Sequence, residues 1–70
     1  MDDEKITELG EVTLPFGRIV TLRSVEYESG LRMLRMVLRE GRRITQVELD
    51  DTSAADLGAK LIEHAGLPRA

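Results

Sequence analysis

Residues 18–49 read RIVTLRSVEYESGLRMLRMVLREGRRITQVEL, and most of the expected strands lie in this segment. Its first run, 18–28, is rich in β-branched residues and ends at a Ser-Gly pair, which is typical of a strand followed by a turn. The run 31–39 contains good helix formers, but it spans only about nine residues between two glycine turns, so its length favours a strand. The run 42–49 follows as another strand. Because connections this short join antiparallel neighbours, the sequence predicts a meander.

The segment before this stretch adds one short strand and a tail. Residues 11–14 alternate polar and apolar side chains, which predicts a strand, and Pro15 with Gly17 fits a turn. Residues 1–10 are polar and acidic, and we expect them to form a flexible acidic N-terminal tail. The remaining chain, 11–70, is expected to form a single small α+β domain.

The segment after the strands predicts one C-terminal helix. The N-cap candidates are Asp51, Thr52 and Ser53, and Gly66 is a stop signal. Apolar residues recur at helical spacing at Ala54, Leu57, Leu61 and Ala65. A helix of roughly 13 residues is marginal alone and must dock on the sheet. The predicted fold class is therefore α+β, an antiparallel β-meander of three to four strands with one C-terminal α-helix packed on one face.

Alternation along the strands sorts the side chains into two faces. One face has no charge in its middle, and we assign it to the helix side: Val12, Leu14, Val20, Leu22, Leu34, Met36 and Leu38. The last strand is out of phase, because Ile44 has one parity while Val47 and Leu49 have the other. A bulge near Thr45 and Gln46 would reconcile the two.

The opposite face mixes apolar side chains with arginines. A solvated face needs fewer apolar groups, whereas apolar groups with arginine are typical of interfaces. We therefore predict a protein-binding surface composed of Ile19, Arg23, Val25, Tyr27, Met33, Arg35, Val37 and Arg39. The alternative, in which the arginine stems merely lie across exposed apolar side chains, stays open.

The small size of the chain supplies a motive for association. A domain of this length buries only about 60% of its unfolded surface, and without cysteine it has no disulfide to compensate. The sequence thus predicts a small non-catalytic protein-interaction module. Its partner would be a second copy, as in a homodimer, or another subunit of a complex.

Charge placement supports one alternative function. Residues 1–11 carry a net charge of −4, residues 18–43 carry +4, and residues 44–70 carry −3. The basic hairpin could contact nucleic-acid phosphates through Arg32, Arg35, Arg39, Arg42 and Arg43. The overall pI near 5.0 and the presence of only two aromatic residues argue against this alternative.

Catalytic, cofactor and metal sites are not indicated. His64 is the only histidine and lies in the last predicted helical turn, where it complements the helix dipole. The acidic cluster of Glu48, Asp50 and Asp51 matches no calcium-loop spacing, and the glycines form no phosphate-binding pattern. We expect no enzyme, no cofactor and no metal.

The expected location is cytoplasmic, as a default. The acidic N-terminus is followed by no apolar run, which argues against a signal peptide, and apolar runs of two or three residues argue against a membrane span. The lack of cysteine is compatible with a reducing compartment. Nothing in the sequence identifies a partner or a pathway.

Overall fold

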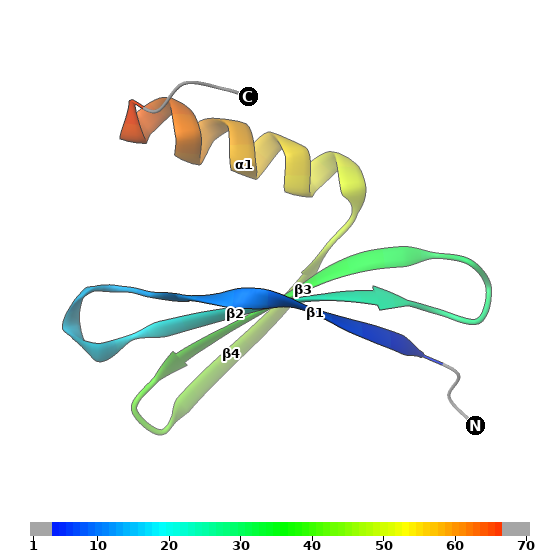
Figure 1. Cartoon of the computed structure of the whole chain (residues 1–70), viewed down its shortest axis with the longest axis horizontal. Coiled ribbons are helices and arrows are strands. Elements are labelled where there is room, and N and C mark those ends of the chain that lie inside the picture. Colours follow the sequence, from blue (N-terminus) through cyan, green and yellow to red (C-terminus); the bar gives the residue numbers. More distant parts are fainter. Residues whose placement is uncertain (1–3, 67–70) are drawn as a thin grey trace.

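The computed structural model describes residues 4–66, which form one four-stranded antiparallel sheet followed by one helix (Figure 1). The strands lie side by side in chain order. The elements are β1 (Lys5–Thr13), a 3-10 turn η1 (Pro15–Gly17), β2 (Ile19–Glu26), β3 (Arg32–Glu40), β4 (Arg43–Leu49) and α1 (Asp51–Ala65). The predicted meander with a C-terminal helix is confirmed.

The first strand is longer than expected. Residues 5–10 were predicted in the tail but form the first half of β1, and Ile6 pairs with Val25 on β2. The register shifts between Glu8 and Gly10, and Gly10 has a φ of 135°. This bulge breaks the period-two pattern, so the alternation that reveals a strand is lost in the sequence. Residues 1–3 of the predicted tail lie outside the described residues.

The fourth strand contains no bulge. Its pairing with β3 runs without interruption from Glu40 opposite Arg43 to Leu34 opposite Leu49, so the bulge predicted near Thr45 and Gln46 is wrong. The out-of-phase Ile44 simply belongs to the other face, opposite Arg39 on β3. A strand at the edge of a sheet can expose one apolar side chain without a change in register.

The predicted helix-side residues of the strands do share one face. Strand pairing aligns Val12 with Val20, and it aligns Leu22 with Met36 and then Val47 across the sheet. Leu34 on this face lines a cleft together with Ala54 of the helix, which identifies the side on which α1 lies. Leu14, also assigned to this face, follows the end of β1 and precedes the 3-10 turn.

The helix begins one residue earlier than its predicted caps. Asp50 is the N-cap, and its carboxylate accepts a hydrogen bond of 2.8 Å from the backbone N–H of Ser53. The three candidates at 51–53 lie inside the first turn, because β4 ends at Leu49 and leaves Asp50 alone as the connection. Gly66 ends the helix in the left-handed conformation, as expected.

The helix packs on the sheet mainly through its first half. It contacts β3 and β4, and within it Ala54, Gly58 and Ala59 are half-buried. Residues 60–65 of the helix are all exposed, including Leu61 and Ile62. The molecule is thin, with extents of 41 × 33 × 15 Å, and Figure 1 shows the helix beside the twisted sheet.

Candidate interaction surface

The structure brings the predicted binding residues together on one side of the sheet. Strand pairing places Ile19 opposite Arg39, Arg23 opposite Arg35, and Val25 opposite Met33, with Val37 opposite Thr21 between them. We call this side the arginine face. Tyr27, just beyond β2, points its hydroxyl to Glu48, which pairs with Arg35 on the same face. That these residues share a face is now established, whereas their role as an interface stays a prediction.

A hydrogen-bonded cluster occupies the middle of the arginine face. The Arg35 guanidinium donates from Nε and Nη2 to one Glu48 carboxylate oxygen, at 2.9 and 2.7 Å. The Tyr27 hydroxyl donates to the same carboxylate at 2.9 Å. The side chains of Arg35 and Glu48 are only 17% and 26% exposed, so this pair is shielded more than a typical surface ion pair.

This cluster perturbs two acid–base equilibria. Hydrogen bonds from Arg35 and then from Tyr27 lower the pKa of Glu48, because they favour the carboxylate. The hydrogen bond to Glu48 raises the pKa of Tyr27, because ionisation would place two negative charges side by side. The same geometry therefore keeps Glu48 ionised and Tyr27 neutral near pH 7.

Tyr27 offers a direct test of the cluster, because it is the only tyrosine in a chain that lacks tryptophan. We expect its phenol absorbance to titrate with a midpoint above 10, and Glu48→Gln should move that midpoint down. Glu28→Gln, a change of an exposed acid in the adjacent turn, should leave the midpoint unmoved. A wild-type midpoint at or below 10 would mean that the hydrogen bond to Glu48 does not persist in solution.

Other charges on the arginine face are also paired within the chain. Arg23 donates to Glu8 of β1 at 2.7 Å, a partner supplied by the segment expected to be a tail. Val25 in the same face is 0% exposed and is the single fully buried hydrophobic residue among residues 4–66. The face is therefore more complete than its sequence indicates.

The five arginines of the nucleic-acid alternative do not form one surface. Arg35 and Arg39 lie on the arginine face, whereas Arg32 and Arg43 lie on the helix side and Arg42 lies in the turn between β3 and β4. Arg35 is held by Glu48, and Arg32 forms an exposed ion pair of 2.9 Å with Asp51. The arrangement spreads positive charge over two sides of the sheet and neutralises part of it.

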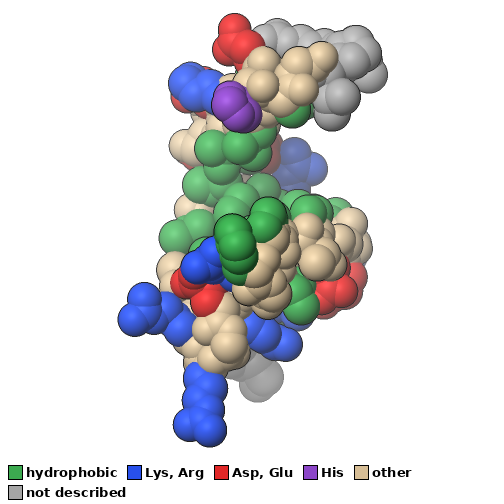
Figure 2. Space-filling view, turned by 90° about the vertical axis from the view of Figure 1, so that its left-hand side faces the viewer, with side chains coloured by type: hydrophobic (Ala, Val, Ile, Leu, Met, Phe, Trp, Pro, Cys, Tyr) green, Lys and Arg blue, Asp and Glu red, His purple; other side chains and the backbone are tan. Residues whose placement is uncertain are grey.

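More of the exposed large hydrophobic residues lie on the helix side of the sheet and on the helix than on the arginine face. Figure 2 shows hydrophobic side chains gathered in the band between the helix, at the top, and the strands below it. On the strands, Leu9, Val12 and Val47 are exposed, and on the helix Leu57, Leu61 and Ile62 are exposed. Two apolar surfaces of one chain thus stand open next to each other.

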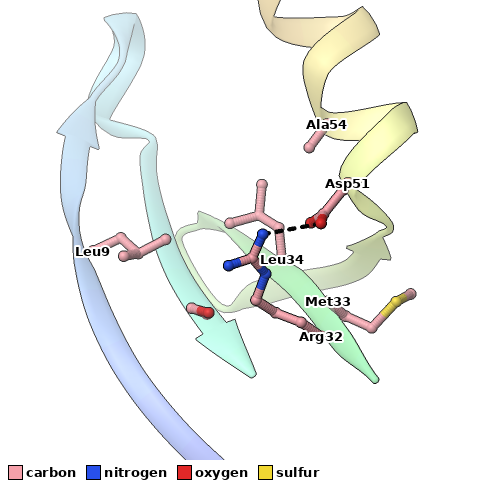
Figure 3. A pocket seen from close by; sticks show the side chains of 7 residues that line it. Leu9, Arg32, Met33, Leu34, Asp51 and Ala54 are labelled. Carbon is pink, nitrogen blue, oxygen red and sulfur yellow. Dashed lines mark hydrogen bonds and ion pairs between the residues drawn. The ribbon is translucent and has the colours of Figure 1, made fainter. Parts of the chain in front are cut away.

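A cleft of about 300 Å³ lies where these two surfaces meet. Leu9 on β1 and Ala54 on α1 stand on opposite sides of it, with Leu34 of β3 between them (Figure 3). The ion pair of Arg32 with Asp51 ties the first helical turn to β3 at this point. The lining offers apolar contact and one ion pair, which is an arrangement for packing rather than for chemistry.

The helix side was not identified from the sequence as an open surface, although the narrow apolar stripe of the helix indicated it. The apolar residues assigned to the helix side were assumed to be covered by the helix. The helix has only a narrow apolar stripe, and its connection to β4 is one residue long. A stripe of this size cannot cover a four-stranded sheet, so part of both surfaces had to remain open.

Among residues 4–66, no three His, Cys, Asp or Glu side chains come together in a way that could hold a metal ion. The one helix of this part of the chain is too short and too polar to cross a membrane.

Comparison with known proteins places the chain in a family. The model of a family of unknown function (DUF6967) matches residues 3–66, and the chain belongs to this family. No curated protein matches the sequence, and no solved structure matches the fold.

Proposed function

We propose that this protein is a small non-catalytic interaction module that works by binding protein, with a second copy of itself as its first partner. The main support for the proposal is that the described chain has almost no hydrophobic core. Within residues 4–66 a single hydrophobic residue, Val25, is fully buried, while ten large hydrophobic residues are exposed. Burial of apolar surface is the main driving force of folding, so such a chain gains stability by association.

The surface area supports the same proposal. A compact monomer of 7.8 kDa would expose about 4,400 Å² by the scaling of folded proteins. The chain exposes 5760 Å². Its radius of gyration is 13.7 Å, whereas about 11 Å is expected for a domain of this length. The excess of about 1,400 Å² is the surface that a partner would cover.

Nucleic-acid binding receives less support. The two sides of the sheet share the basic residues, and ion pairs already satisfy Arg23, Arg32 and Arg35. The proposal includes a cytoplasmic location, with which the lack of cysteine is compatible. Mixed-sequence DNA and RNA should show no mobility shift at low ionic strength, and a salt-sensitive shift would favour the alternative.

Self-association predicts that stability depends on concentration. For a dimer that unfolds as it dissociates, the melting temperature should rise by about 4 °C for each tenfold increase in protein concentration. Sedimentation equilibrium on the same samples should give twice the mass of 7.8 kDa. A monomer that melts at one temperature from micromolar to millimolar concentration would contradict the proposal.

A further inference from the structure

The chain carries both halves of a helix-on-sheet interface and leaves both incomplete. The helix half, which we call the helix stripe, consists of Leu57, Leu61 and Ile62. The sheet half, which we call the sheet patch, consists of the exposed Val12 and Val47 and the half-buried Val20, Leu22, Met36 and Leu38. We propose that the helix stripe of one copy packs on the sheet patch of a second copy, and that the contact is reciprocal. This inference rests on the proposed self-association and specifies its surface.

The chain's own helix is held away from the sheet patch by its attachment. One residue, Asp50, separates β4 from α1, and its side chain caps the helix through the Ser53 N–H. The first turn is also tied to β3 by the ion pair of Arg32 with Asp51. These contacts fix the direction in which the helix leaves the sheet. Leu61, three turns further along, is 60% exposed as a result.

The available area fits a second copy. If each copy covers its excess of about 1,400 Å², a dimer buries about 2,800 Å² in total, which is within the range of obligate homodimers. A two-fold axis lets the same two surfaces serve both copies, so that each helix stripe meets the sheet patch of the other copy. A helix stripe and an apolar sheet face are the ordinary components of an α+β core.

Charge does not oppose the same pairing. The helix over 51–65 carries three acids and one lysine. On the helix side of the sheet, Arg32 lies opposite Glu26 and Arg43 lies opposite Glu40, so this side has no excess of acids that would repel the helix.

The arginine face is the less suitable surface for the second copy. Its central charges are paired inside the chain, through Arg35 with Glu48 and Arg23 with Glu8. Its most buried residue, Val25, is already fully covered. The exposed apolar residues on this side are Ile6 and Ile44, which lie on the two edge strands and not in the centre.

Two residues of nearly equal exposure, one on each surface, can test which surface binds the second copy. Leu61 is 60% exposed on the helix stripe, and Ile44 is 59% exposed on the arginine face. We expect Leu61→Lys to raise the dimer dissociation constant at least about 100-fold, because it places a charge in a desolvated contact. Ile44→Lys should change the dissociation constant by less than about threefold. Circular dichroism at protein concentrations above each variant's dissociation constant should show that both variants keep the fold, since neither side chain is buried within its own chain.

Cross-linking supplies a second readout, since the chain has no cysteine of its own. A Leu61→Cys protein mixed with a Val47→Cys protein should form a disulfide between copies under mild oxidation. A mixture of Leu61→Cys with Ile44→Cys should not, although Val47 and Ile44 lie on the same strand and are both exposed.

The outcomes distinguish this inference from the proposed function. A dimer that Ile44→Lys dissociates and Leu61→Lys does not would overturn the surface assignment and leave self-association standing. Cross-links of Leu61→Cys with Ile44→Cys would have the same meaning. A wild-type chain that stays monomeric at millimolar concentration would overturn both.

Discussion

Val25→Asp is expected to abolish the folded state, with loss of the far-ultraviolet circular dichroism signal of the sheet and the helix. Val25 lies on a central strand between Ile6 of β1 and Met33 of β3, and it is 0% exposed. A carboxylate at this position would be cut off from water, and the arginines beside it on this face, Arg23 and Arg35, are already paired with Glu8 and Glu48. Because the described chain has no second fully buried residue to sustain a core, this one change removes the packing centre.

The milder Val25→Ala gives the measurable form of this prediction. We expect a loss of about 2 kcal/mol in the free energy of unfolding, from the lost methyl groups and the cavity that remains. Ile6→Ala, which truncates the exposed neighbour on β1, should cost less than half as much. Urea denaturation of both variants at one protein concentration measures the difference. Equal losses would show that Val25 is not the centre of packing.

Glu48→Gln is expected to have the next largest effect, lowering the melting temperature at pH 7 by roughly 5–10 °C. The substitution removes the negative charge of the Glu48 carboxylate, which accepts two hydrogen bonds from Arg35 and one from Tyr27. A half-buried guanidinium then loses its nearest counter-charge and keeps only Glu4, at 3.9 Å, which is costly because Arg35 is only 17% exposed. Glu28→Gln in the exposed turn should leave the melting temperature almost unchanged.

The same pair predicts how stability responds to acid. The pKa of Glu48 is lower in the folded chain than its ordinary value, so its contribution is fully present above pH 4.5 and is lost as the pH falls through the folded value. Asp50 contributes in the same direction, because the Ser53 N–H lowers its pKa. Melting temperatures between pH 7 and pH 2 should therefore fall less steeply for Glu48→Gln than for the wild type. Parallel profiles would show that the pair does not couple to folding.

Much of the architecture could be predicted because it is encoded locally. The strands β2 to β4 follow from β-branched content, length and the glycine turns, and the helix follows from helical spacing. The grouping of Arg23, Arg35 and Val25 on one face follows from parity along the strands. The start of β1 could not be predicted, because the bulge at Gly10 interrupts the alternation and leaves Ile6 without a visible pattern. The predicted bulge in β4 is wrong because the register there is continuous, and Ile44 simply lies on the arginine face, opposite Arg39.

What the sequence determined by itself was the order of elements and the two faces of the sheet, since both depend on side chains close together along the chain. Only the tertiary structure decided which of these surfaces is complete. The pairing of Glu48 with Arg35, and of Glu8 with Arg23, joins residues far apart in sequence, and it neutralises the face that seemed unfinished. The one-residue connection at Asp50 sets the direction of the helix and leaves the helix side of the sheet partly uncovered. Charge pairing and helix direction depend on distances in space, which alternation along a strand does not encode.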